Sequence, residues 1–173
     1  RFEENSGTTT YDLSGSDNNG TITGADWNSS GKIGNALTFD ASDQVILGST
    51  INLDTVGTVA KDWTVSAWVN ANGDGAIMGP DSGGPATNEM GITSGKIYYG
   101  NYDGVWQTHN GALSVSNGKW HYLTWVNHAN ETMDMYVDGV LDSTSGFASL
   151  TTNNAPVNAI GRSWYRSMNG TID

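Results

Sequence analysis

The sequence predicts an all-β protein made of two packed antiparallel sheets, a β-sandwich. Short runs rich in β-branched and aromatic residues recur along the chain, and clusters of Gly, Asn, Asp and Ser separate them. Only 14% of the residues are charged and 23 of 173 are glycine, so residues that favour helices are scarce. About a dozen short strands require two sheets that bury their apolar sides against each other.

The clearest strands carry apolar residues at every second position. They span residues 63–69, 120–126 and 132–137, and we expect the last two to pair with each other. Asp138-Gly139 follows the third strand directly and precedes Val140-Leu141. Because glycine tolerates the positive φ of a type I′ turn, this dipeptide predicts a two-residue hairpin.

Weaker patterns predict the remaining strands and two loops. Gly, Asp and Pro are concentrated at 70–74 and 79–88, and the second stretch is long enough to be a functional loop at the rim of the sandwich. The weaker strands are expected at 21–23, 36–39, 45–47, 76–78, 96–99, 105–108, 155–160 and 170–172.

Charge and composition exclude several functions. The chain has 18 acidic and 7 basic residues, a net charge of −11, which repels the phosphate backbone of nucleic acids and favours cations and neutral ligands. It has no cysteine, so thiol catalysis and thiolate metal sites are excluded. No apolar stretch reaches the roughly 18 residues of a membrane-spanning helix, so we expect no membrane insertion.

Seven segments along the chain share their order and spacing with a known family. They are FEENSGTTTYDLSGSDNNGT (2–21), GKIGNALTFD (31–40), DWTVSAWV (62–69), GKWHYL (118–123), YVDG (136–139), GR (161–162) and GTID (170–173). In these segments the sequence resembles the laminin G-like jelly roll of the concanavalin A-like lectin and glucanase superfamily. The resemblance covers nearly the whole chain and implies a jelly-roll sandwich.

The resemblance does not extend to the catalytic motif of the superfamily's glucanases. Those enzymes carry an E-x-D-x-x-E strand, and none of Glu3, Glu4, Glu89 and Glu131 stands in that pattern. The three histidines lie in no nucleophile context, and we expect His121 to be a partly buried, hydrogen-bonded residue of its strand. We therefore predict that the protein is not an enzyme.

Calcium is the cofactor that the sequence favours. The turn at 12–20 is rich in Asp, Asn and Ser, whose oxygens are the ligands that calcium prefers. The resemblance implies a structural calcium held by Asp12, Asn19 and Asp173, which would join the two ends of the chain. The alternative is that these are Asx-turn residues bonded to their own backbone.

Aromatic residues in turn-rich segments are the candidate ligand-binding residues. Carbohydrate sites commonly place an aromatic ring against the apolar side of a sugar, with polar groups at its hydroxyls. The four rings and one base expected to bind ligand are Tyr102, Trp106, Trp164, Tyr165 and Arg162. Four other tryptophans are expected inside the sandwich: Trp63, Trp68, Trp120 and Trp125.

These observations predict one domain over residues 1–173, cut from a longer, secreted or surface-displayed protein. We expect a calcium-stabilised binding module whose partner is a glycan or cell-surface polysaccharide. The alternative is a structural or adhesive domain of a surface filament, virion or cell envelope that binds protein neighbours. A glycoside hydrolase is the third and weakest possibility.

Overall fold

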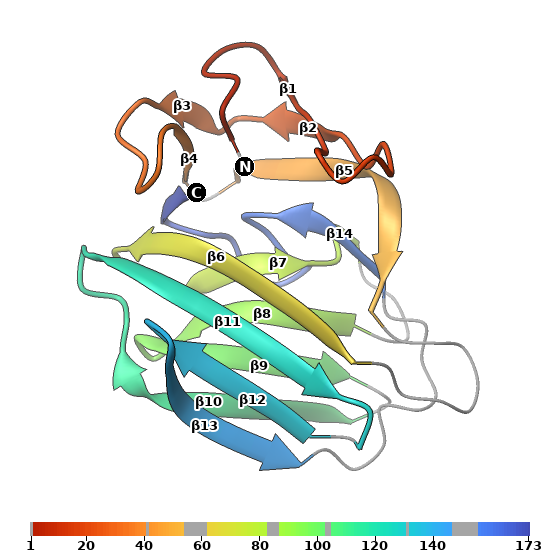
Figure 1. Ribbon diagram of the computed structural model, residues 1–173, viewed down its shortest axis with the longest axis vertical. Helices are drawn as coiled ribbons and strands as arrows, with labels where there is room; N and C mark the ends of the chain where they lie inside the picture. The colour runs from red at the N-terminus through yellow and green to blue at the C-terminus, as the bar shows by residue number, and fades with distance from the viewer. Residues whose placement is uncertain are drawn as a thin grey trace.

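The computed structural model contains two antiparallel β-sheets that face each other (Figure 1). In the part of the chain that it describes there are fifteen strands and no helix, and hence no helix that could cross a membrane. The predicted two-sheet sandwich is confirmed. The described residues are 2–40, 42–53, 62–82, 87–102, 105–130, 132–146 and 156–173.

One sheet has eight strands and the other has seven. Strands that are far apart in the chain are neighbours in both sheets, as in a jelly roll. In spatial order, the eight-stranded sheet consists of β1 (Thr9–Thr10), β2 (Gly20–Thr23), β5 (Gln44–Asn52), β14 (Pro156–Ile160), β7 (Gly75–Gly79), β8 (Thr87–Thr93), β9 (Lys96–Tyr102) and β10 (Trp106–Ser114).

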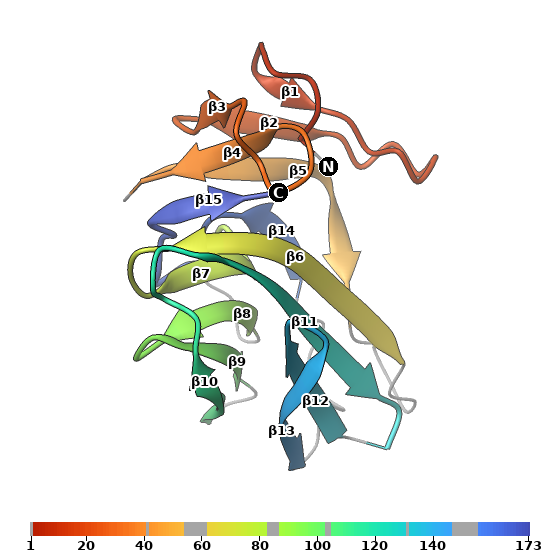
Figure 2. The same cartoon turned by 60° about the vertical axis from the view of Figure 1, so that its left-hand side comes forward.

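The seven-stranded sheet packs against it, and Figure 2 shows the two layers from the side. Its central strand, Trp63–Ala71, pairs with Trp120–His128 over most of its length. In spatial order, its strands are β13 (Val140–Gly146), β12 (Thr132–Val137), β11 (Trp120–His128), β6 (Trp63–Ala71), β15 (Gly170–Ile172), β4 (Ala36–Phe39) and β3 (Asp26–Asn28).

Every predicted strand has a counterpart in the structure, although several are longer than predicted. Three strands were not predicted: β1, β3 and β8. The strand β8 begins at Thr87, inside the stretch predicted to be a loop, and residues 83–86 of that stretch lie outside the described residues. Its first residues, Thr87-Asn88-Glu89, are polar, which hid the strand pattern.

The hydrophobic core lies between the sheets and contains one tryptophan completely. Trp125 is fully buried and donates its indole N–H to the backbone oxygen of Tyr98 at 2.9 Å. Trp63 is partly buried against the same core. The expectation for these two tryptophans is therefore confirmed.

The expectation that Trp68 and Trp120 lie inside is wrong. Val69 points into the core, so its neighbour Trp68 points to the outer side of the seven-stranded sheet. There its ring lies 5.1 Å from that of Tyr122, and the Lys32 amine lies 4.8 Å above it. Trp120 is half-buried on the same outer side, two residues before Tyr122 on β11.

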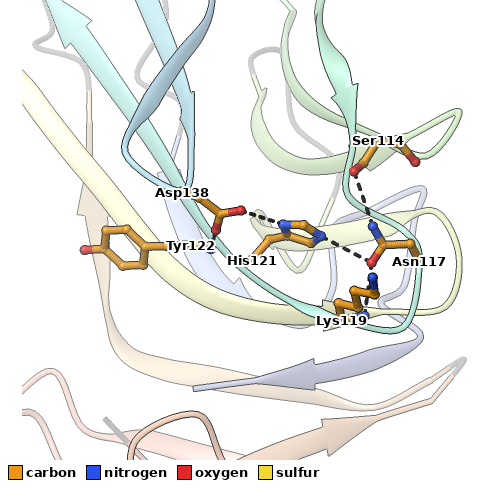
Figure 3. A network of polar contacts seen from close by, with 6 residues as sticks. All are labelled: Ser114, Asn117, Lys119, His121, Tyr122 and Asp138. Atoms are coloured by element: carbon orange, nitrogen blue, oxygen red, sulfur yellow. Dashed lines mark hydrogen bonds and ion pairs between the residues drawn. The ribbon is translucent and has the colours of Figure 1, made fainter.

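The hairpin between β12 and β13 has the predicted turn, with φ of 53° at Asp138 and 80° at Gly139. Figure 3 shows how polar contacts hold it: Asp138 accepts a hydrogen bond from the Tyr122 backbone N–H, and its second oxygen lies 2.8 Å from His121 Nδ1. Burial raises the pKa of Asp138, but these hydrogen bonds and the charges of His121 and Lys32 bring it below its ordinary value. His121 Nε2 lies 3.2 Å from Asn117 Oδ1, so His121 is the partly buried, hydrogen-bonded residue that we expected.

Candidate functional site

The outer side of β8–β10 carries a set of aromatic rings. Tyr99 on β9 points into the core, so Tyr98, Gly100 and Tyr102 point outward. Trp106 on β10 is directly opposite Tyr102, and the two ring centroids are 6.2 Å apart. We call this side the aromatic face: Tyr102 and Trp106 lie on it, and Tyr98, which points the same way, is fully buried.

Gly100 allows the rings of Tyr98 and Trp106 to lie close to the β9 backbone. A Cβ at this position would clash with the Tyr98 hydroxyl and lie 2.9 Å from the ring of Trp106. Without that atom, Trp106 packs over β9 beside Tyr98 while 37% of its surface stays exposed. Trp106 is therefore supported from below and open to a ligand from above.

A short hairpin, residues 161–168, lies against the same side of the sheet. Arg162 and Ser167 form a β-bridge, the Ser163 N–H donates to the Arg166 oxygen at 2.7 Å, and the Met168 N–H donates to the Gly161 oxygen at 2.8 Å. Trp164 and Tyr165 form its tip, so we call it the ring hairpin. Their rings are 49% and 74% exposed and lie 6.0 Å apart, nearly perpendicular.

The carboxylate of Glu89 on β8 joins the ring hairpin to the aromatic face. Glu89 is only 2% exposed, and its Oε2 accepts a very short hydrogen bond from the Ser163 hydroxyl. Its Oε1 lies 3.4 Å from Arg166 Nε. Burial raises the pKa of Glu89, and the Ser163 hydrogen bond and the Arg166 charge oppose this rise.

Arg166 connects the two groups of rings. Its guanidinium lies 4.8 Å above the ring of Tyr98, which is the neighbour of Trp106 on the aromatic face. Burial raises the pKa of the Tyr98 hydroxyl, and the Glu89 charge adds to this rise, so the hydroxyl stays neutral. Beside Arg166 a surface pocket of about 260 Å³ is lined by Asp74, Gly75, Thr93, Arg166 and Ser167.

The structure brings four of the five predicted ligand-binding residues to one side of the molecule: Tyr102 and Trp106 on strands, and Trp164 and Tyr165 on the ring hairpin. Arg162 does not join them, because its guanidinium points to Gln44 of β5: Arg162 Nη1 lies 3.5 Å from Gln44 Oε1. Arg166 and Glu89 were missed as site residues. No local sequence signal identified Glu89, because its strand was not predicted and its contacts come from a distant segment.

The three predicted calcium ligands are engaged in hydrogen bonds of two separate loops. Asp12 accepts from the Ser14 N–H and hydroxyl, both at 2.8 Å, and from the Asn18 N–H at 3.0 Å. The Ser14 bonds lower the pKa of Asp12. The Ser14 N–H bond to Asp12 is an Asx turn, and Asn19 closes the loop by accepting from the Asp12 N–H at 2.8 Å.

Asp173, which follows β15, reaches the other loop, at residues 31–35, and accepts a hydrogen bond from the Ile33 N–H at 2.6 Å. Glu3 binds the same loop through Asn35, with bonds of 3.3 and 3.2 Å. The two ends of the chain therefore meet through direct hydrogen bonds to residues 31–35, and both views show them close together (Figure 1, Figure 2). Among the described residues no three His, Asp or Glu side chains are close enough to hold a metal ion. Calcium also binds amide and backbone oxygens, so calcium binding at Asp12, Asn19 and Asp173 stays a prediction.

Replacing Asp12 with alanine provides a direct test of the calcium prediction. We expect the variant to melt at a lower temperature than the parent in chelator, because the turn loses three hydrogen bonds. The same decrease should be measured in millimolar calcium if the turn binds no metal. A melting temperature that rises with calcium in the parent but not in the variant would instead establish the site that the sequence predicts.

The chain belongs to the concanavalin A-like lectin/glucanases superfamily. A laminin G family model with that description matches residues 39–173, which is most of the chain. The predicted resemblance is thereby confirmed. A search of curated proteins found no match.

Among solved structures, domain 4 of AbnA, an extracellular GH43 arabinanase from Geobacillus stearothermophilus in complex with arabinotriose, is similar to this chain. Its TM-score is 0.67 at 20% identity, over 89% of this chain and 79% of that chain. A structure of botulinum neurotoxin type C, whose cell entry depends on interaction with two ganglioside molecules, has a TM-score of 0.66 at 17% identity and covers 96% of this chain. The binding domain of botulinum neurotoxin DC, in complex with rat synaptotagmin II, has the same TM-score and identity and covers 97%. This chain spans only 41% and 45% of those two neurotoxin chains, and all three likenesses establish the fold alone.

Proposed function

We propose that this chain is a non-catalytic, extracellular module that binds a neutral glycan on the aromatic face and the ring hairpin. The observation that carries the proposal is the exposure of Trp106, Trp164 and Tyr165 on one side of a rigid sheet. Exposed aromatic rings offer apolar area at a small entropic cost. The C–H side of a sugar ring is a matching surface.

Polar groups beside the rings could bind the sugar hydroxyls. The pocket next to the ring hairpin offers the Arg166 guanidinium as donor and the Thr93 and Ser167 hydroxyls as both donors and acceptors. A few such groups around an apolar platform are typical of a preformed ligand site.

The charges favour a neutral glycan over an acidic one. Glu89 lies against Arg166 and compensates its charge, so the pair has little net charge while the guanidinium can still donate hydrogen bonds. The chain as a whole carries −11, which repels anions at long range. An acidic sugar would gain little at Arg166 and would be repelled by the rest of the surface.

The environment of Glu89 argues against hydrolysis. A glycosidase needs two carboxyl groups that face each other across the sugar bond. Glu89 is the buried carboxylate beneath the aromatic face: its Oε2 accepts the Ser163 hydroxyl, and its Oε1 lies 3.4 Å from Arg166 Nε without a hydrogen bond. It is therefore poorly placed to attack a sugar or to protonate a leaving group.

Two of the similar structures support a glycan as the ligand. One is a complex with arabinotriose, and another concerns a protein that interacts with gangliosides.

Replacing Trp106 with alanine tests the aromatic face. We expect glycan affinity to fall about tenfold, which corresponds to about 1.4 kcal/mol, because the sugar loses one stacking surface. The melting temperature should change little, since Trp106 is 37% exposed. Affinity is measured by isothermal titration calorimetry with a glycan that the parent retains. An unchanged affinity would remove Trp106 from the site, and a large loss of stability would assign it to the core.

A second candidate function is adhesion to a protein neighbour. The specific observation is that Trp68, Tyr122 and Trp120 lie on the outer side of the seven-stranded sheet, where the sequence analysis did not expect Trp68 and Trp120. One similar structure is a complex with a protein, synaptotagmin II. This candidate gains support only if no glycan is bound.

A further inference from the structure

We infer that Glu89 is the positioning residue of the binding site: its carboxylate holds the ring hairpin in the orientation that presents Trp164 and Tyr165 to a glycan. This inference deepens the proposed function and rests on it. Glu89 would not touch the ligand and would act through the two residues that flank the rings.

The Glu89 carboxylate contacts the residues on both sides of the ring-hairpin tip. Its two oxygens engage Ser163, immediately before the rings, and Arg166, immediately after them. The Ser163 N–H to Arg166 oxygen bond closes the tip at the same place. A rigid clamp at both sides leaves the two-residue tip little freedom to turn relative to the sheet.

The ring hairpin is closely packed against the sheet at Ser163. Ser163 is 1% exposed, and a Cβ at Gly79 of β7 would lie 2.7 Å from the Ser163 Cβ. The hairpin backbone is therefore pressed against the sheet at Ser163. Because Glu89 is also buried, water does not compete strongly for its oxygens, and the two contacts are stronger than they would be at the surface.

The contact between Glu89 and Arg166 links the ring hairpin to the aromatic face. Arg166 is held by Glu89 on one side and lies over Tyr98 on the other, and Tyr98 packs beside Trp106. Loss of the Glu89 charge would leave Arg166 uncompensated and free to move toward water. The ring hairpin would then no longer be held in a fixed position relative to the aromatic face.

The inference predicts a pH dependence of binding. The groups that face Glu89 are Arg166 from the hairpin and Tyr98 from β9, whose hydroxyl stays neutral because burial raises its pKa. Burial raises the pKa of Glu89, so its carboxylate takes up a proton at a higher pH than an exposed glutamate. Acidification through that pKa removes the charge that holds Arg166, and glycan affinity should fall.

The test is the substitution Glu89→Gln, which keeps the shape of the side chain and removes its charge. We expect about a tenfold loss of affinity for a neutral oligosaccharide that the parent binds, and a flat pH profile where the parent loses affinity on acidification. Hydrogen exchange should accelerate at the Ser163 and Met168 amides, whose bonds close the ring hairpin. The matched control is Glu4→Gln, a glutamate that accepts the Tyr11 N–H elsewhere in the chain, and it should change none of these.

Ser163→Ala is the second variant, because the buried Glu89→Gln protein could fail to fold. It removes one of the two contacts and keeps the Cβ that packs on Gly79, and we expect a smaller loss of affinity with faster exchange at the same amides. Equal affinity and exchange in the parent and both folded variants would overturn the inference and leave the proposed function standing. A parent protein that binds no glycan would overturn the proposed function and this inference with it.

Discussion

Replacing Trp125 with alanine is expected to lower the free energy of unfolding by about 3–5 kcal/mol, the range for truncating a buried aromatic residue. Trp125 is fully buried at the centre of the core, so its removal leaves a cavity between the sheets. The truncation also removes the hydrogen bond that the Tyr98 backbone oxygen accepts from the indole N–H. Urea denaturation of the parent and the variant measures the difference.

The matched control for Trp125 is Trp164→Ala, which removes the same side chain from an exposed position. Trp164 is 49% exposed, and we expect a change of less than about 1 kcal/mol. A small effect at Trp125 would contradict the assignment of the core, and a large effect at Trp164 would show that this ring has a structural role.

The double substitution Trp164→Ala and Tyr165→Ala is expected to lower glycan affinity at least about a hundredfold, or about 2.7 kcal/mol. Binding energy at interfaces is concentrated in a few aromatic and Arg residues. Trp164 and Tyr165 are the two aromatic residues of the ring hairpin, and both are exposed. Stability should change little because both rings lie at the tip, outside the Ser163–Arg166 bond that closes it. Titration calorimetry and a thermal melt of the same samples separate the two effects.

The control for the double substitution is Tyr11→Ala, which removes an exposed ring from the N-terminal part of the chain. Tyr11 is 57% exposed, and its loss should leave glycan affinity unchanged. An equal loss of affinity in this control would move the binding site away from the ring hairpin. Full affinity in the double variant would contradict the role of both rings.

The inner strands and the 138–139 hairpin could be predicted because their signals are local. Alternation along β6, β11 and β12 determines which side chains point inward, and an Asp-Gly dipeptide is sufficient for the turn. The same alternation, read strictly, would also have placed Trp68 on the outside. The error came from treating tryptophan as a core residue regardless of its register.

The Glu89 clamp could not be predicted, because it depends on contacts between distant segments. Glu89 and Ser163 are 74 residues apart, and nothing near Glu89 in the sequence indicates that a hairpin will cover it. The hydrogen bonds of the predicted calcium ligands could be predicted only in part. Those of Asp12 lie within its own turn, whereas Ile33, the partner of Asp173, is 140 residues away.

The most direct test of the central claim is a glycan array probed with the purified protein, once in millimolar calcium and once in chelator. We expect retention of a related set of neutral glycans in both buffers, and loss of that retention in the Trp164→Ala, Tyr165→Ala double variant. Retention that disappears in chelator would add calcium to the account. An array on which the parent protein retains nothing would contradict the glycan-binding function and direct the search to protein neighbours at the outer side of the seven-stranded sheet.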